Sequence, residues 1–295
     1  MSFLSWLGQL QRLIAPVAQQ CLSCSNRTSS FSPLQGVCTP CYAGIPWISK
    51  PRCVHCGRGT GCPDCTRATR EERYFILNRS AVSYDAHMRE MLAQYKYRGD
   101  ERYAQVLTPM LVRAYQALQR ELSQAVNKSI QGSMLEQGSM TLRDQARSQF
   151  QYKGSKAAWR PDLITCIPVS QARLQERGFN QAEVLGRGAA EAVGVPFAQL
   201  LNRQRHTDKQ SFKSRNARMA NMSGAFQCSS TAPDVIELMR RQRAAALQGE
   251  PLRIVIVDDI YTTGSTMNAA AYNLRLLAQQ TGQSIEVVSL TWARS

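Results

Sequence analysis

The stretch from Arg253 to Ala278 constrains the fold more than any other part of the chain, because it predicts a strand, a turn and a helix in immediate succession. Ile254 to Val257 is an uninterrupted run of β-branched residues, which is typical of a parallel strand buried on both faces. Two adjacent carboxylates, Asp258 and Asp259, then end the predicted strand. Such a unit fits an α/β fold whose parallel sheet is covered by helices.

Small and hydroxyl-bearing residues fill the turn between this acid pair and the helix. They offer hydroxyl donors and free backbone N–H groups at a helix N-terminus, where anions bind. The residues are Thr262, Thr263, Gly264, Ser265 and Thr266. Carboxylates beside a site for phosphate alone would repel it, so the combination indicates a ribose 5-phosphate, with hydroxyls on the acids and phosphate in the turn. The alternative is that these residues only cap the helix, but a cap needs one such residue.

Eight of the ten cysteines form four CxxC pairs near the start of the chain. Each pair can present two thiolates to one metal ion, and two pairs complete a tetrahedron. The pairs are Cys21/Cys24, Cys38/Cys41, Cys53/Cys56 and Cys62/Cys65. The segment around them is rich in turn residues and poor in apolar ones, so we expect metal to hold it together. We predict two structural zinc sites, formed by sequential pairing into two ribbons in series or by cross-brace pairing.

The formal net charge is +15, and roughly +11 would remain if two Zn(Cys)₄ units carry about −2 each. This charge favours polyanions such as nucleic acid, or small phosphorylated ligands; a solvated arginine-rich surface is the alternative. No apolar run approaches the ~20 residues that span a bilayer, so the sequence predicts no integral membrane segment.

The sequence predicts three parts: an amphipathic helix over 1–20, a double zinc-ribbon module over 21–66 and a main domain over 74–295. Strands that alternate with helices predict an α/β parallel sheet in the main domain, with the ligand at the carboxyl ends of the strands. An inserted loop, partly disordered, is predicted over about 119–156 from its Gln, Ser, Gly and Met content. The other predicted elements are strands at 81–84, 162–169, 197–201 and 285–292, helices from 86 and from 101 and at 180–193 and 234–246, and a polar loop at 171–177.

Several motifs together resemble one protein family. They are the four CxxC pairs, YKYRGD at 95–100, RGFNQ at 177–181, TDKQSFKSRNARMANMSGAF at 207–226 and VIVDDIYTTGST at 255–266. The last is similar to the ribose-phosphate signature of the type I phosphoribosyltransferases, which use phosphoribosyl pyrophosphate (PRPP). The combination resembles the ComF family of competence-associated proteins, which includes the GntX proteins. The resemblance covers the chain from about Cys21 to its last residue.

This resemblance implies a phosphoribosyltransferase-like domain that binds PRPP, behind a zinc-ribbon module. Asp258 and Asp259 would contact the ribose hydroxyls, and Mg²⁺ would bridge them to the pyrophosphate. Arg173 and Arg177, in the polar loop after the first core strand, are the candidates for the pyrophosphate, because arginine makes forked charge-assisted bonds to phosphate oxygens. Gln171 and Ala172 replace the proline or arginine usual in the family, which makes this loop less basic.

The resemblance also implies a cytoplasmic role in natural competence, in which the protein handles incoming single-stranded DNA during uptake and transformation, together with other competence proteins. An alternative is an active enzyme that transfers ribose 5-phosphate from PRPP to a nitrogenous acceptor. A third is a scaffold whose sugar-phosphate site no longer turns over. No stretch is recognisable as an acceptor-base site.

The basic stretch from Arg203 to Arg218 is the sequence's candidate for DNA contact. In phosphoribosyltransferases the corresponding region is a mobile loop that closes over the substrate. Six cations exceed what one small ligand needs, so we predict that Lys209, Lys213 and Arg215 contact a DNA backbone. The zinc ribbons are the rival site.

Overall fold

The computed structural model describes residues 19–30, 32–66, 72–97, 102–132, 158–204, 224–243, 247 and 249–295. The chain divides into two compact units between Ile45 and Pro46. We call 1–45 the N-terminal unit and 46–295 the body. This division falls inside the predicted double zinc ribbon, so that each unit contains two of the four CxxC pairs.

The N-terminal unit has little regular structure among its described residues. β1 (Gln19–Gln20) pairs antiparallel with β2 (Arg27–Thr28), and α2 (Thr39–Ala43) follows Cys38. Within 19–30 and 32–45, the buried apolar residues are few: Cys21, Leu34, Val37, Cys38 and Ile45. So small a core needs a further source of stability. Of the predicted amphipathic helix over 1–20, residues 1–18 lie outside the described part of the chain.

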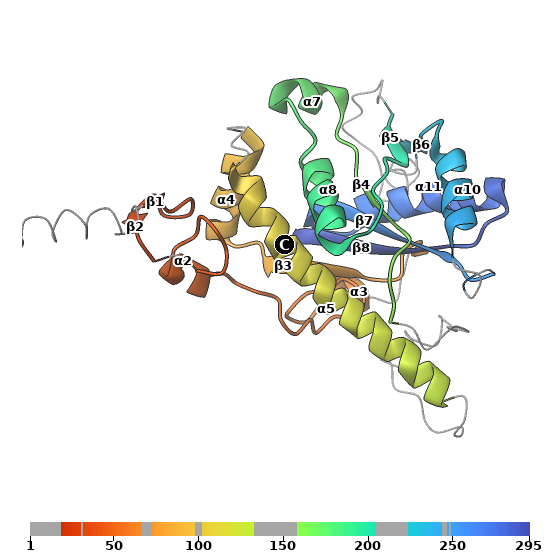
Figure 1. Ribbon diagram of the computed structural model, residues 1–295, viewed down its shortest axis with the longest axis horizontal. Coiled ribbons are helices and arrows are strands. Elements are labelled where there is room, and N and C mark those ends of the chain that lie inside the picture. Colours follow the sequence, from red (N-terminus) through yellow and green to blue (C-terminus); the bar gives the residue numbers. More distant parts are fainter. Residues whose placement is uncertain are drawn as a thin grey trace, which may run out of the picture. The chain divides into compact units, whose positions relative to one another are not determined.

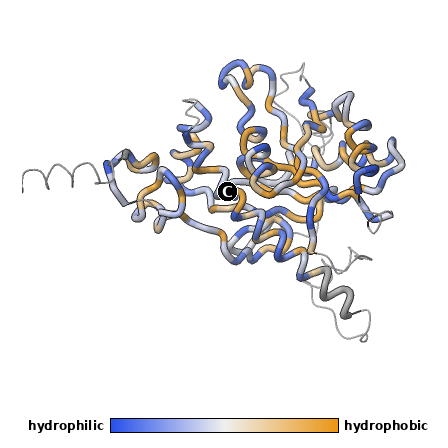
Figure 2. Tube along the Cα trace, viewed as in Figure 1, coloured by the Kyte–Doolittle hydropathy of each residue, from blue (hydrophilic) through white to orange (hydrophobic). Residues whose placement is uncertain are grey.

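A four-stranded parallel sheet forms the centre of the body, which confirms the predicted α/β class (Figure 1). The strand order is β3-β8-β7-β4. The strands are β3 (Asn78–Ser83), β8 (Ile285–Arg294), β7 (Leu252–Tyr261) and β4 (Leu163–Cys166). Hydrophobic residues line the central strands (Figure 2), and β7 and β8 are buried over most of their length, as expected for strands covered on both faces.

Helices cover both faces of the sheet. Ile254 and Ile256 lie in the core cluster that includes Leu274 and Leu277 of α11, whereas Gly186 of α8 approaches Val257. Because alternate residues of a strand point to opposite faces, α11 and α8 cover different faces. α5 packs against α8, and α10 packs against α11 (Figure 1). The helices of these layers are α5 (Arg102–Gly132), α8 (Gln181–Val193), α10 (Ala232–Gln242) and α11 (Ser265–Thr281).

The remaining elements of the body surround the carboxyl ends of the strands or connect them. They are α3 (Pro63–Thr66), α4 (Ala86–Tyr97), α7 (Gln171–Arg177) and the antiparallel hairpin of β5 (Leu201–Arg203) and β6 (Phe226–Cys228). The last two CxxC pairs pack into the core: Cys56, Cys62 and Cys65 are buried with residues of β7 and α11. No helix in the described ranges has the length and hydrophobicity to cross a membrane.

Two predicted loops are wrong, because local contacts extend helices into them. α5 continues to Gly132, so residues 119–132 are helical, and Leu122 continues its buried face; residues 133–156 of the predicted insert lie outside the described part of the chain. The predicted polar loop at 171–177 is α7, since the Ser170 side chain caps it by accepting from Arg173 N–H and Gly178 ends it at φ 79°.

Strand boundaries also differ from the prediction. β7 does not end at the acid pair but continues to Tyr261, because β8 pairs with it throughout: Asp258 lies opposite Thr291, and Tyr261 lies opposite Arg294. β4 stops at Cys166, short of the predicted end at Val169. The predicted strand at 197–201 is displaced to β5, and Phe197 forms only an isolated bridge with Ile164.

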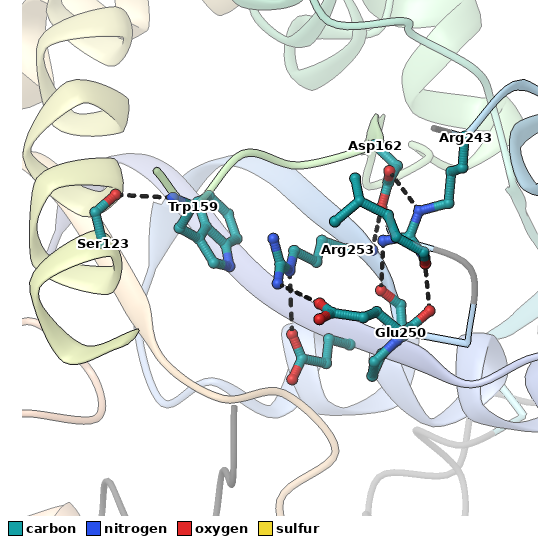
Figure 3. Close-up of polar contacts among 9 residues, drawn as sticks. Ser123, Trp159, Asp162, Arg243, Glu250 and Arg253 are labelled. Carbon is teal, nitrogen blue, oxygen red and sulfur yellow. Dashed lines mark hydrogen bonds and ion pairs between the residues drawn. The ribbon is translucent and has the colours of Figure 1, made fainter. Parts of the chain in front are cut away.

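Buried ion pairs hold the opposite end of the sheet, where β4 and β7 begin (Figure 3). The carboxylate of Asp162 accepts hydrogen bonds from Arg243 Nε at 3.0 Å and from Arg253 N–H at 2.8 Å. Arg253 Nη2 also pairs with Glu250 Oε2 at 3.0 Å. Every member of this network is partnered, as buried charges require. The network fixes the start of β7.

We expect Cys62→Ser to lower the free energy of unfolding of the body by at least ~3 kcal/mol, because the sequence predicts structural zinc at these cysteines and Cys62 lies in the core. Such zinc contributes on the order of 10 kcal/mol to the folding of small modules. Cys24→Ser, the same change in the N-terminal unit, should leave the body's unfolding unchanged. Urea unfolding followed by tryptophan fluorescence measures both, since Trp47, Trp159 and Trp292 lie in the body. Equal losses of unfolding free energy in the two variants would contradict the prediction that only the last two CxxC pairs stabilise the body.

Candidate functional site

The acid pair lies on the extension of β7, at the carboxyl ends of the parallel strands. Asp258 Oδ1 accepts a hydrogen bond from Asp259 N–H at 2.9 Å, and both residues are half-buried. Burial and the neighbouring charge of Asp259 raise the pKa of Asp258 to about 8. At neutral pH, Asp258 therefore carries a proton most of the time and can both donate to and accept from a hydroxyl group.

Lys96 of α4 forms an ion pair with Asp259 Oδ2. The two side chains are only 14% and 15% exposed, so the pair is shielded from solvent. Sequence reasoning used the YKYRGD motif for the family resemblance but assigned no role to Lys96. That motif was the available signal, because the two partners lie far apart in the sequence and come together only in the fold.

The turn after β7 is open at the N-terminus of α11. Gly264 has φ 89°, and a Cβ there would lie 2.1 Å from Tyr261 Oη, so only glycine fits over this ring. Thr262, Thr263 and Ser265 are exposed, and Thr266 is half-buried. The hydroxyls of Thr263 and Ser265 lie 2.6 Å apart. The first turn of a 17-residue helix thus presents N–H groups and hydroxyls to solvent, which is the arrangement that binds phosphate.

Of the two predicted pyrophosphate arginines, Arg173 is exposed on α7 and Arg177 is engaged in contacts within the body. Arg177 Nη1 donates to Gln181 Oε1 at 2.9 Å, and its guanidinium lies 5.2 Å from the centre of the Tyr97 ring. Tyr95 Oη also donates to the carbonyl oxygen of Gln181 at 3.3 Å. The YKYRGD and RGFNQ motifs therefore pack against each other, and Arg177 joins α7 to α4.

Arg203 is a further cation of this region. Burial lowers its pKa, as does the nearby charge of Arg173, while Asp258 acts in the opposite direction. Arg203 therefore interacts electrostatically with both Arg173 of α7 and Asp258 of the acid pair. The predicted DNA contacts Lys209, Lys213 and Arg215 lie outside the described residues.

An open pocket of about 810 Å³ lies between α7 and the β5 hairpin. Side-chain amides are its main polar lining, and Arg203 forms part of its wall. The amide residues are Gln171, Gln175, Asn180, Gln199, Asn202 and Gln204. Amides supply both donors and acceptors, so the pocket suits an uncharged polar ligand group.

The eight CxxC cysteines form two clusters by sequential pairing. Their sulfur atoms lie within 4.8 Å of one another in each cluster: Cys21, Cys24, Cys38 and Cys41 in the N-terminal unit, and Cys53, Cys56, Cys62 and Cys65 in the body. Four thiol donors at this spacing fit zinc. The surroundings also fit a negatively charged metal–thiolate centre. Cys38 N–H donates to Cys21 Sγ at 3.3 Å, and Arg73 Nη2 donates to Cys65 Sγ at 3.7 Å.

We expect Asp258→Asn to raise the melting temperature in a pH-dependent way. The pKa of Asp258 in the folded state, about 8, is above its ordinary value of 3.8. The folded wild type therefore loses stability as the pH rises towards 8, because Asp258 ionises more readily in the unfolded chain. Asparagine can still accept from Asp259 N–H but cannot ionise. The gain in free energy of unfolding should be near zero at pH 4 and reach on the order of 5 kcal/mol at pH 8.5, from ~1.4 kcal/mol for each unit between the two pKa values.

Scanning calorimetry at several pH values measures this gain. Asp234→Asn, at an exposed position at the start of α10, is the control, and its effect should not follow this pH profile. A gain for Asp258→Asn that is equal at pH 4 and pH 8.5 would contradict the raised pKa.

Comparison with known proteins gives relatives over most of the chain, although no family model matches it. The chain is 27% identical to competence protein ComFC of Bacillus subtilis, over 93% of this chain and 95% of that protein. It is 24% identical to competence protein ComFC of Streptococcus pneumoniae, over 86% of each chain. It is 31% identical to the DNA utilization protein YhgH of Escherichia coli K12, over 43% of this chain and 48% of that protein. These matches confirm the resemblance that the sequence motifs indicate and place the chain among the homologues of the ComFC competence proteins.

Proposed function

We propose that this protein binds PRPP at the end of β7 and acts in natural competence, where it handles single-stranded DNA. The competence role is supported by the ComFC homologues. One observation carries the PRPP proposal: an acid pair and an open helix N-terminus follow each other on one strand–turn–helix unit, around Tyr261 and Gly264. The acids match the hydroxyls of a ribose, and the turn matches its 5-phosphate.

The state of the acid pair supports a sugar ligand. A protonated Asp258 can donate to one ribose hydroxyl, and Asp259, neutralised by Lys96, can accept from the other. Magnesium prefers oxygen ligands and is usually shared between carboxylates and substrate phosphates. When bound with PRPP, Mg²⁺ would neutralise the pyrophosphate beside Asp258 and Asp259.

We assign different roles to the arginines around the pyrophosphate. Arg173 is exposed and free to reach a ligand, and we propose that it acts on one anion together with Arg203, with which it interacts electrostatically. Repulsion between two such cations is relieved when an anion binds between them. Arg177 is held by Gln181 and Tyr97, so its role is to hold α7 in place.

We propose zinc in both cysteine clusters, with a structural role. All four ligands of each site are protein thiols, which leaves no open position for catalysis.

Transfer of ribose 5-phosphate to a nitrogenous acceptor is the alternative function. It is favoured by the amide-lined pocket beside Arg203, which could hold a polar acceptor group. Incubation of the protein with labelled PRPP and Mg²⁺ distinguishes the two functions. Pyrophosphate release would support the transferase, and binding without release, with or without single-stranded DNA, would support the binding role.

We expect the double variant Asp258→Asn/Asp259→Asn to weaken Mg²⁺–PRPP binding at least tenfold, since one ribose hydroxyl loses the charged acceptor Asp259, worth about 1.5–3 kcal/mol, and the other loses the carboxyl donor of Asp258. Titration calorimetry measures the affinity, and circular dichroism checks that the variant is folded. The control variant Asp234→Asn should bind as the wild type does. A well-folded double variant with wild-type affinity would disprove the ribose assignment.

We expect the DNA affinity to depend on salt through the basic stretch. If about three cations contact phosphates, log K against log [salt] for single-stranded DNA should have a slope near −2, at ~0.7 per contact. Changing Lys209, Lys213 and Arg215 to alanine should flatten this slope to a similar degree for different DNA sequences, because phosphate contacts carry no base information.

Fluorescence anisotropy at several salt concentrations measures the slope. An unchanged slope in the triple variant, together with loss of binding when residues 1–66 are deleted, would instead assign the DNA site to the cysteine clusters.

A further inference from the structure

Arg294, near the end of β8, connects the cysteine cluster of the body to the strand that carries the candidate ligand site. Its side chain is buried, and the residue is 4% exposed. Arg294 Nη2 donates to Cys56 Sγ at 3.6 Å, and Nη1 donates to the carbonyl oxygen of Tyr261 at 3.2 Å. The guanidinium also lies 4.9 Å from the centre of the Tyr261 ring. One side chain thus contacts a cluster sulfur and both ends of Tyr261.

Tyr261 determines the shape of the turn at 262–266, which we call the phosphate-binding turn. It is the last residue of β7, and its buried ring lies directly beneath Gly264, where even a Cβ would overlap with its hydroxyl. The ring is held on another side by edge-on contact with Phe75, with 6.3 Å between ring centres. A shift of Tyr261 would therefore move the N-terminus of α11.

The turn that carries Cys56 is fixed to the sheet. Gly57, at φ 72°, packs so closely on β3 that a Cβ would lie 2.6 Å from the carbonyl oxygen of Asn78. Asn78 N–H donates to the carbonyl oxygen of His55 at 2.7 Å, and Asn78 Nδ2 donates to that of Cys56 at 3.2 Å. The sulfur that Arg294 contacts consequently has a defined position when the cluster is intact.

Charge makes the contact between Arg294 and Cys56 a strong stabilising interaction. Among the described residues, no Asp or Glu side chain forms an ion pair with Arg294. Its Nη1 also donates to the backbone oxygen of Ser295, and its buried Nε has no hydrogen-bond partner. A buried guanidinium requires a compensating negative charge. A metal-bound Cys56 is a thiolate in a centre of net charge about −2, and hydrogen bonds to such sulfurs are a usual part of zinc sites.

We propose that metal binding at the body's cysteine cluster positions the phosphate-binding turn through Arg294 and Tyr261, and so sets the affinity for the 5-phosphate. Arg294 is a positioning residue in this proposal: it contacts neither the ligand nor the metal. Loss of the metal removes the negative charge that holds the guanidinium of Arg294. Tyr261 is then less constrained, and so is Gly264, which packs against the Tyr261 ring. The part concerning affinity rests on the proposed function; the part concerning the turn does not.

A double-mutant cycle on the full chain tests the proposal. Amide hydrogen exchange of the peptide over 258–268 is compared in the wild type, Arg294→Met, Cys56→Ser and the double variant, and ribose 5-phosphate affinity is measured in parallel. Each single change should speed exchange in the turn at least about tenfold, because each removes a hydrogen bond to a charged group. The double variant should exchange no faster than the faster single variant, since both changes break one connection.

Two controls separate this connection from general destabilisation. Cys24→Ser removes the equivalent thiol from the other cluster and should leave exchange over 258–268 unchanged. Arg294→Met should retain metal in the body's cluster and native exchange in α5, with faster exchange confined to the turn. Arg294→Lys keeps the buried charge but has only one nitrogen, so its exchange rate in the turn should lie between those of the wild type and Arg294→Met. This variant is used in place of Cys56→Ser if Cys56→Ser does not fold.

Additive effects in the cycle, or native exchange in the turn of Arg294→Met, would overturn the proposal. The same holds if Arg294→Met speeds exchange throughout the body, since Arg294 would then be an ordinary core residue. If the wild type does not bind ribose 5-phosphate, the proposed function fails, and hydrogen exchange still decides whether the cluster controls the turn.

Discussion

The parallel pairing of β7 with β8 is the constraint on which the rest of the structure depends. It runs from Leu252 to Tyr261 without losing register, and so carries the backbone past the hydrophobic layer and out to the carboxyl edge of the sheet. The end of that strand determines the positions of the acid pair, of the turn at Gly264 and of α11. The same pairing brings Arg294 of β8 beside Tyr261 of β7. The cysteine cluster of the body is thereby connected to the candidate ligand site through two adjacent strands.

Features that depend on neighbours in sequence could be predicted. The run from Ile254 to Val257, followed by acids and by a glycine-containing turn, predicts the strand, the open turn and the helix, and the structure has all three. The CxxC spacing predicts cysteine clusters because two thiols of one turn necessarily lie close together. The alternation of strands and helices was enough for the α/β class, since a parallel sheet needs crossover connections.

Features that depend on distant partners could not be predicted. Nothing near Asp259 in the sequence indicates Lys96, and nothing near Cys56 indicates Arg294; each contact exists because elements far apart in the chain come together in the fold. β7 was predicted too short because two acids are poor strand residues, and pairing with β8 overrides that preference. The helix at 171–177 was missed because a cap at Ser170 and a stop at Gly178 outweigh its polar composition.

The neutralised acid pair has a consequence for the order in which ligands bind. With Asp258 protonated and Asp259 paired to Lys96, the empty site presents almost no net negative charge at neutral pH. Free Mg²⁺ therefore finds no strong electrostatic attraction there, and an approaching polyanion meets little repulsion. In the proposed function, Asp258 and Asp259 would therefore hold Mg²⁺ together with the anion rather than ahead of it.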